Sequence, residues 1–215
     1  PAIGIDELPR IDYVLISHNH YDHLDLESIR AIGNDALWLI PLKNGALLES
    51  VGVTNYVELD WWDTHSISGW KFTATPVQHW SARGINDRFE CLWSGWAAQH
   101  NDFSFYFAGD TGYNAKDFKE TGRRFGSFDL ALIPIGAYAP RSFMKLMHVD
   151  PFEAVQIHQD VNSRFSLALH WGTFPLTAES PGEPPVKLRE ALRAANLSRD
   201  SFLAVPIGST TRIPD

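Results

Sequence analysis

The sequence of 215 residues contains a single cysteine, Cys91. An internal disulfide is therefore excluded, and so is a zinc site built from cysteine thiolates. No apolar run approaches the roughly 20 residues that a membrane-spanning helix needs, and the longest, residues 130–139, contains Pro134 and Gly136. No signal peptide is recognisable, and the chain begins at Pro1 rather than at Met. We expect a location in the cytoplasm or at a membrane surface.

Positive charge is also scarce. The 18 Lys and Arg residues face 26 Asp and Glu residues, so the formal net charge is -8. Proteins that bind nucleic acids usually carry a basic surface. We therefore expect no nucleic-acid partner, and a tRNA-processing nuclease is disfavoured. A single phosphate held by metal ions is not excluded, because the ions bring positive charge of their own. The 44% of hydrophobic residues is typical of a globular domain with a sizeable core.

Histidine, by contrast, is concentrated in one short segment. Four potential metal ligands fall within six residues: His18, His20, Asp22 and His23. They follow an apolar run, residues 11–17, that predicts a buried strand. Imidazole and carboxylate groups suit zinc or a similar divalent ion. Four ligands this close in sequence do not easily converge on one tetrahedral ion, so the spacing favours two ions, with His18 and His20 on one and Asp22 and His23 on the other. The alternative, a solvated turn, is disfavoured because an apolar strand leads directly into it.

The first 60 residues alternate between predicted strands and helices. The strands are residues 11–17, 37–40 and 56–59, and the helices run to Ile32 and over 45–51. Four strand-like segments without intervening helices follow, at 65–68, 71–77, 92–98 and 103–108, and predict antiparallel hairpins of a second sheet. This pattern indicates a layered α/β protein.

After Asp110 the alternation of helix and strand returns. Helices are predicted over 114–125, from Asp150 onward and over 184–195, and strands over 130–135, 165–169 and 202–207. Asp150 is expected to cap its helix, because Pro151 and Glu153 follow at the first and third helical positions.

Three further candidate ligands share one position type, the C-terminal end of an apolar strand. They are His79, Asp110 and His170. Each alone is a weak signal, since a single histidine near a strand end is more often structural. Together with the first four they make seven candidates, five His and two Asp. This is the number that two zinc ions require if one carboxylate and one hydroxide bridge them.

These motifs resemble those of a known family. Residues 18–23, followed in order by His79, Asp110-Thr111-Gly112 and His170, resemble the metallo-β-lactamase superfamily of binuclear metallohydrolases. Longer stretches resemble N-acylphosphatidylethanolamine-hydrolysing phospholipase D and its bacterial relatives: residues 15–25, 78–80, 107–113, 134–138, 147–151, 170–174 and 184–188.

The resemblance implies a fold and a ligand set. The fold is an αβ/βα four-layer sandwich with the site between the upper edges of its two sheets. His18, His20 and His79 would hold one zinc ion, Asp22, His23 and His170 the other, and Asp110 would bridge them. Members of the family carry strands before the first motif that are absent here. We therefore expect residues 1–215 to be a single hydrolase domain, the C-terminal portion of a longer chain, whose first sheet lacks its N-terminal strands.

The resemblance also implies an activity. Two zinc ions sharing an oxygen lower the pKa of bound water toward neutrality and supply a hydroxide nucleophile. The expected reaction is hydrolysis of an N-acylated phosphatidylethanolamine to phosphatidic acid and an N-acylethanolamine. Asp22 and Asp110 are the expected catalytic carboxylates, and His148 is the candidate donor to a phosphate oxygen or the leaving group. The alternative for His148 is that it only caps the helix entered at Asp150.

Substrate and partners are less sharply defined. Apolar side chains in or near the site loops are candidates for a mouth that admits acyl chains: Trp80, Phe143, Met144, Leu146, Met147, Trp171 and Phe174. The expected partner is a phospholipid or other phosphodiester, with peripheral membrane contact and a homodimer as further possibilities. Competing functions on the same scaffold are a sugar-phosphate lactonase, a cyclic-nucleotide phosphodiesterase and a non-catalytic metal- or lipid-binding relative. His65, His100 and His158 are expected to be surface or structural residues.

Overall fold

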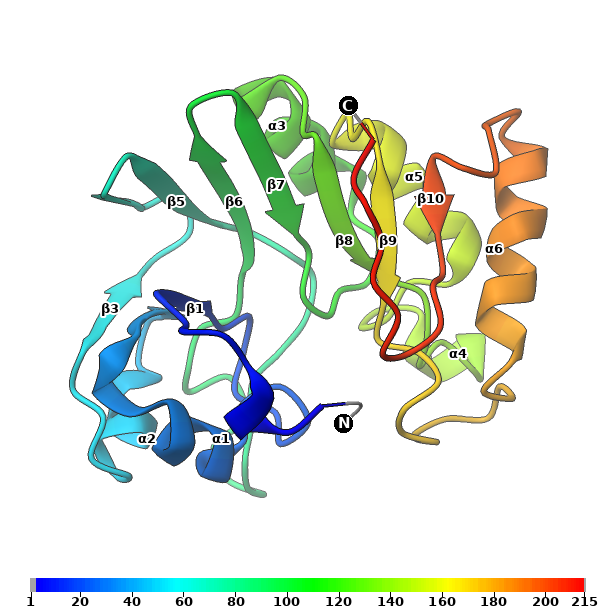
Figure 1. The fold of residues 1–215 in the computed structure, drawn as a ribbon. Helices are drawn as coiled ribbons and strands as arrows, with labels where there is room; N and C mark the ends of the chain where they lie inside the picture. Colours follow the sequence, from blue (N-terminus) through cyan, green and yellow to red (C-terminus); the bar gives the residue numbers. More distant parts are fainter. Residues whose placement is uncertain (1–2, 215) are drawn as a thin grey trace.

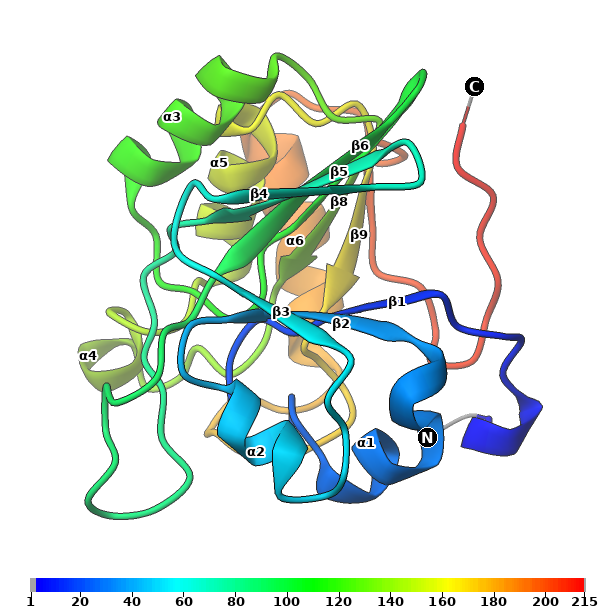
Figure 2. The ribbon, with the colours of Figure 1, turned by 90° about the vertical axis from the view of Figure 1, so that its left-hand side faces the viewer.

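Two β-sheets pack face to face at the centre of the molecule, and helices cover their outer faces (Figures 1 and 2). The structure is a computed structural model that describes residues 3–214. Among these residues, no helix is both long and apolar enough to cross a bilayer.

The first sheet has three parallel strands in the order β1-β2-β3. They are β1 (Tyr13–Leu15), β2 (Leu37–Pro41) and β3 (Tyr56–Leu59). Helices α1 (Leu26–Ile32) and α2 (Gly45–Glu49) lie on its outer face, and the short 3-10 helices η1 (Ile5–Glu7) and η2 (Gly33–Asp35) flank it. Ile29 of α1 and Leu48 of α2 are fully buried in one cluster with Trp38 and Ile40 of β2. This cluster joins the helical layer to the first sheet.

The second sheet has seven strands in the order β10-β9-β8-β7-β6-β5-β4. They are β4 (Thr64–Ile67), β5 (Trp70–Thr75), β6 (Gly95–His100), β7 (Phe103–Phe107), β8 (Leu130–Pro134), β9 (Ser166–Leu169) and β10 (Phe202–Leu203). Helices α3 (Ala115–Phe125), α5 (Pro151–Asp160) and α6 (Glu183–Ala194) cover its outer face, and α4 (Arg141–Met144) lies in the loop after β8. The strands from β4 to β7 pair antiparallel, as predicted, and those from β7 to β10 pair parallel.

A third cluster of buried residues holds the two sheets together. Leu39 of β2 and Leu59 of β3 pack against Phe72 of β5 and Trp96 of β6. Because Leu39 alternates with Trp38 and Ile40, β2 is buried on both faces, which explains its continuous apolar sequence. The predicted four-layer αβ/βα sandwich is confirmed.

The direction of the strands brings the site together. β5 runs antiparallel to β6, and β6 runs antiparallel to β7, so β5 and β7 point the same way. β8 and β9 are parallel to β7. The C-terminal ends of these four strands therefore meet at one edge of the sheet.

Most predicted strands have slightly different bounds in the structure, and β6 and β10 differ for reasons that the contacts show. β6 begins at Gly95 rather than at 92, because the amides of Leu92 and Ser94 donate instead to the carbonyls of Leu42 and Ser17 in the first layer. β10 ends at Leu203 rather than at 207. Pro206 has no N–H with which to continue the ladder.

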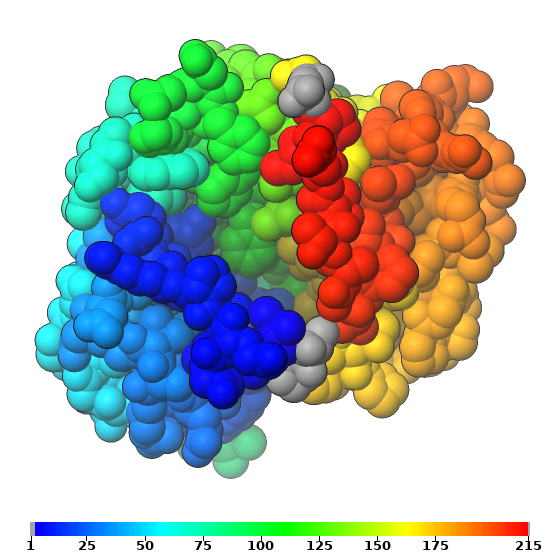
Figure 3. Space-filling model, in the orientation of Figure 1, coloured from blue at the N-terminus to red at the C-terminus, as the bar shows by residue number. Residues whose placement is uncertain are grey.

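The inner face of the second sheet is covered unevenly. Leu132, Leu167 and Leu169 of β8 and β9 are only half-buried, while the residues between them on the outer face are packed against helices. Figure 3 shows a hollow between the N-terminal segment (blue) and the C-terminal segment (red). That strands are missing from the first sheet stays a prediction.

Candidate metal centre

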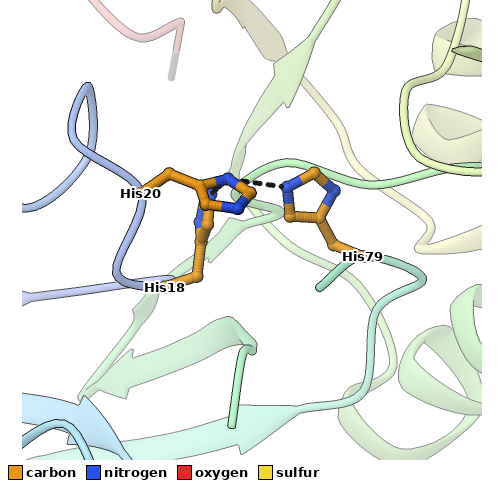
Figure 4. A group of neighbouring side chains, drawn as sticks. All are labelled: His18, His20 and His79. Atoms are coloured by element: carbon orange, nitrogen blue, oxygen red, sulfur yellow. Dashed lines mark hydrogen bonds between the residues drawn. The ribbon is translucent and has the colours of Figure 1, made fainter. Parts of the chain in front are cut away.

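Three of the predicted ligands, His18, His20 and His79, form a compact group (Figure 4). His18 Nε2 lies 2.8 Å from His20 Nδ1, and His79 Nε2 lies 3.3 Å from the same atom. His18 and His20 come from the turn after β1, and His79 comes from the segment after β5. Three imidazole nitrogens facing one another at these distances form a group able to hold one metal ion.

Asp22, His23 and His170 form a second group beside the first. Asp22 Oδ2 lies 3.4 Å from Nε2 of both His23 and His170. His170 follows β9, so this group also joins the turn after β1 to the edge of the second sheet.

Asp110 lies between the two groups. Its Oδ2 atom is 3.1 Å from His23 Nε2, 3.2 Å from His170 Nε2 and 3.9 Å from His79 Nε2. The side chain is buried, and its Oδ1 atom has no hydrogen-bond partner. The structure thus brings all seven predicted ligands together, with Asp110 in the central position.

Glycines make this close approach possible. A Cβ atom on Gly109, which has φ +62°, would lie 2.5 Å from Cβ of Ser17. A Cβ atom on Gly136 would lie 2.2 Å from the carbonyl oxygen of His170. Side chains at either position would push the ligand-bearing segments apart.

The pKa shifts divide these ligands into two sets: histidines held in the neutral form, and a His23–Asp110 pair held in the charged form. Burial lowers the pKa of His18 well below its ordinary value and that of His79 to about 3, so both rings are neutral and available as ligands. Burial alone would lower the pKa of His23, but the charges and hydrogen bonds of Asp110 and Asp22 raise it to about 10. Burial would also raise the pKa of Asp110, yet the charges of His170 and His23 hold it well below the usual range.

The cluster fits a metal better than it fits any internal network. Nε2 of His20, Nδ1 of His170 and Oδ1 of Asp110 are buried without hydrogen-bond partners. Unpartnered buried polar atoms are costly. Their number in one small volume, together with the His and Asp composition, is what a divalent metal site requires.

Two contacts behind the ligands were not predicted from the sequence. Ser17 Oγ lies 3.0 Å from His18 Nδ1, and the carbonyl oxygen of Met147 lies 2.9 Å from His79 Nδ1. Each contact orients the ring so that its Nε2 atom faces the cluster. The position of Ser17 directly before the motif is a usable sequence signal. The Met147 carbonyl carries none, because any residue supplies one.

His148 lies at the edge of the cluster. Its Nδ1 atom is 3.9 Å from Asp110 Oδ2, and its ring contacts those of His79 and His170. The helix α5 is capped by Asp150, whose side chain accepts from the amides of Phe152 and Glu153, as predicted. The alternative that His148 is only a helix cap is therefore wrong.

His148 is also neutral and firmly held. Burial lowers its pKa to about 4, although Asp110 opposes this shift. Arg141 donates from Nη1 to the His148 carbonyl at 2.7 Å and from Nη2 to Glu153 at 2.6 Å. Arg141 thus fixes the backbone that carries His148.

The remaining histidines predicted to be structural lie outside these groups. His158 is buried, and its Nδ1 atom lies 2.8 Å from Ser166 Oγ. His100 stacks on Trp70. Within residues 3–214, neither these two nor His65 belongs to a group of side chains that could hold a metal.

A cavity of about 300 Å³ opens beside the second group of ligands. Asp22, His23 and His170 form one wall, and most of the remainder is apolar: Phe107, Leu169, Trp171, Phe174, Pro175, Leu176 and Pro184.

Of the residues predicted to form an apolar mouth, Trp171 and Phe174 line this cavity. Trp80 instead contacts the ring of His20, and Phe143, Met144, Leu146 and Met147 lie outside the described lining. Phe143 and Leu146 are exposed because they belong to α4 and the turn after it.

The layered sandwich and the His/Asp cluster define a class, the proteins of the metallo-β-lactamase fold with a site able to hold metal ions. The crystal structure of an isothiocyanate hydrolase from Delia radicum gut bacteria superposes with a TM-score of 0.75, covering 98% of this chain and 79% of that one. At 21% identity this likeness shows the fold alone. The profile of the β-lactamase superfamily domain matches residues 1–171, so the chain belongs to that superfamily.

Two curated relatives are more similar in sequence. The N-acyl-phosphatidylethanolamine-hydrolyzing phospholipase D 1 of Caenorhabditis elegans is 39% identical over 229 residues, which cover 100% of this chain and 64% of the worm protein. The mitochondrial N-acyl-phosphatidylethanolamine-hydrolyzing phospholipase D of Saccharomyces cerevisiae is 40% identical over 192 residues, covering 86% of this chain and 41% of that protein. The chain thus spans less than two thirds of the length of either relative.

Proposed function

We propose that this hydrolase is a zinc-dependent phosphodiesterase of the phospholipase D type that acts on N-acylphosphatidylethanolamine-like lipids. The observation that carries the proposal is the seven-residue His/Asp cluster opening into an apolar cavity at Asp22, His23 and His170. The similarity to the worm and yeast enzymes supports the same substrate class. We also propose that residues 1–215 act as one domain, because the cluster draws ligands from both sheets.

The proposed cofactor is two zinc ions per chain. His18, His20 and His79 would hold one ion, Asp22, His23 and His170 would hold the other, and Asp110 would contact both. When bound, such ions act as Lewis acids toward a phosphodiester and supply a nucleophilic water at neutral pH.

The side chains of this chain have distinct roles in the proposal. Asp110 and Asp22 are acceptors that orient the attacking water and compensate the charge of the metals. His148 is neutral at pH 7, so it can donate one N–H to a phosphate oxygen or to the departing alkoxide. Its distance of 3.9 Å from Asp110 supports a position beside the bound phosphate. The proposal keeps His148 outside the ligand set, although His79, Asp110 and His148 also form a group able to hold a metal ion.

The apolar cavity supports a lipid substrate over a small polar one. Phe107, Leu169 and Trp171 contribute its inner wall, and Phe174 and Leu176 lie at its exposed rim, 61% and 58% accessible. A hydrocarbon chain entering there would remove apolar surface from water on both sides. A polar sugar phosphate has little apolar surface to bury against such a wall, and a cyclic nucleotide has only the faces of its base. Contact with a membrane surface and homodimer formation remain predictions.

A substrate screen with full-length protein tests the proposal. N-acylphosphatidylethanolamine in detergent micelles, a sugar-phosphate lactone and a cyclic nucleotide are compared with and without chelator. We expect chelator-sensitive turnover of the lipid alone. In water enriched in oxygen-18, one label enters phosphatidic acid and none enters the N-acylethanolamine, because water attacks phosphorus and the bond to the ethanolamine oxygen breaks.

The competing functions predict different results. Preferred turnover of the lactone or the cyclic nucleotide would replace the proposed substrate while keeping the metal chemistry. Two equivalents of zinc without turnover of any substrate would favour a binding protein.

A further inference from the structure

Arg83 connects the two ends of the turn that carries four of the proposed ligands. We define this ligand turn as residues 18–24. A single guanidinium nitrogen, Nη1 of Arg83, donates to the carbonyl of Asn19 at 3.0 Å and to the carbonyl of Leu24 at 2.7 Å. His20, Asp22 and His23 lie between these two carbonyls in the chain. One side chain from a distant loop therefore closes the segment that presents them.

Tyr21 reinforces this contact from within the turn. The guanidinium carbon of Arg83 lies 4.1 Å from the centre of the Tyr21 ring, and the Tyr21 hydroxyl donates to the Arg83 carbonyl at 2.8 Å. The turn and residue 83 thus hold each other through both backbone and side chain. The planar guanidinium suits this stacked position better than an ammonium group does.

The loop that carries Arg83 is itself held in shape. Asp87 accepts from the backbone amides of Arg83 and Gly84, both at 2.8 Å. The amide of Phe89 donates to the carbonyl of Ser81 at 2.9 Å. Arg83 therefore projects from a braced loop, which is the property required of a residue that positions another segment.

The ligand turn needs such outside support. Its backbone amides at His23 and Leu24 both donate to the carbonyl of His20, at 3.1 and 2.9 Å. This leaves the carbonyls of Asn19 and Leu24, the two that Arg83 binds, free of partners within the turn. Four ligands on so short a segment would otherwise sample conformations in which the two half-sites do not form.

We propose that Arg83 is a positioning residue that holds the ligand turn in its metal-binding conformation by closing its ends at Asn19 and Leu24. The inference rests on the metal site in the proposed function. The positive charge of Arg83 and its closure of the ligand turn have opposite effects on metal affinity. Loss of a positive charge beside two cation sites strengthens metal binding by Coulomb's law, whereas loss of the closure weakens it.

The experiment compares metal affinity rather than turnover. Metal-free wild type, Arg83→Met, Arg83→Lys and Arg30→Met are titrated with zinc against a chromophoric chelator. Arg30 lies on α1 just after the turn and, among residues 3–214, forms an ion pair only with Glu27, at 3.9 Å. Its replacement controls for loss of one charge. We expect Arg83→Met to bind zinc about 10- to 100-fold more weakly, Arg83→Lys to lose less, and Arg30→Met to bind as tightly as wild type or slightly tighter.

The outcomes separate the inference from the proposed function. Wild type that binds no zinc contradicts the metal site itself. Wild type that binds zinc, with a folded Arg83→Met variant that binds it equally or more tightly, overturns only the role of Arg83. If circular dichroism shows that Arg83→Met does not fold, Arg83→Lys decides, and wild-type affinity in that variant overturns the inference.

Discussion

The carbonyl oxygen of Met147 lies 2.9 Å from Nδ1 of His79, so the loop that carries His148 is joined directly to a proposed ligand. The same loop is held by Gln78, whose Nε2 donates to the Leu146 carbonyl at 2.9 Å. The orientation of the His79 ring and the position of His148 are therefore linked. A change in one is expected to disturb the other.

Replacing His20 by alanine tests the metal site. His20 Nδ1 faces both His18 and His79, so its loss removes the centre of the first group. We expect His20→Ala to lose metal and to fall below detectable turnover. Metal content by mass spectrometry and a phosphodiesterase assay measure both. His65→Ala, outside the cluster, should match wild type, and retained turnover in His20→Ala would contradict the proposed mechanism.

Replacing His148 by glutamine separates proton donation from metal binding. We expect turnover to fall about 100-fold or more, the usual size of a general acid contribution. The metal content should stay unchanged, because the two groups proposed to hold the ions do not include this ring, although His79, Asp110 and His148 form a further group able to hold a metal. Parallel loss of metal and activity would instead make His148 a ligand.

Gly136 is expected to tolerate no side chain. A Cβ atom there would lie 2.2 Å from the His170 carbonyl, which is backbone and cannot turn aside. We expect Gly136→Ala to reduce the free energy of unfolding by about 1–3 kcal/mol and to weaken metal binding through His170. Gly182→Ala is the matched control, since nothing lies within 4 Å of its added atom. Urea unfolding measures the first effect, and equal stability of the two variants would contradict the expected clash.

The titration of His158 is expected to make the free energy of unfolding depend on pH. Burial lowers its pKa from 6.5 to about 4. Between these values the unfolded chain binds a proton that the folded chain does not, so the free energy of unfolding decreases as the pH falls below 6.5 and levels off near 4. We expect this residue to contribute about 2 kcal/mol less stability at pH 5 than at pH 7.5. Urea unfolding of metal-free wild type and His158→Gln should show their stability difference shrinking over that range, and a constant difference would exclude the titration.

Replacing Leu176 by glutamate tests whether a lipid substrate contacts the apolar cavity. Leu176 lies at the rim and is 58% exposed, so Leu176→Glu should fold normally. We expect a higher KM for the lipid and unchanged turnover of a small water-soluble diester, because only the lipid contacts the rim. Ile85→Glu introduces the same charge at a site 96% exposed and outside the described cavity lining. An equal loss in both variants would point to general contact with micelles rather than to the cavity.

Much of the site was predictable because its signals are local. A dense run of ligands after an apolar strand marks residues 18–23, and the same position type marks His79, Asp110 and His170. The C-terminal ends of parallel strands share one edge, so these residues converge once the strands take a common direction. The predicted bounds of β6 and β10 were wrong because hydrogen bonds to another layer and a proline, rather than apolar sequence, ended the ladder.

The sequence by itself determined the layered α/β fold, the seven ligand candidates and the helix cap at Asp150, because periodicity, ligand chemistry and capping act over a few residues. Only the tertiary structure decided which atoms face one another. The Met147 carbonyl behind His79, the closure of the ligand turn by Arg83 and the place of His148 beside Asp110 all join residues 38 or more positions apart. Backbone carbonyls and long side chains carry no sequence signal of their partners, so these contacts follow from the packing of the two sheets.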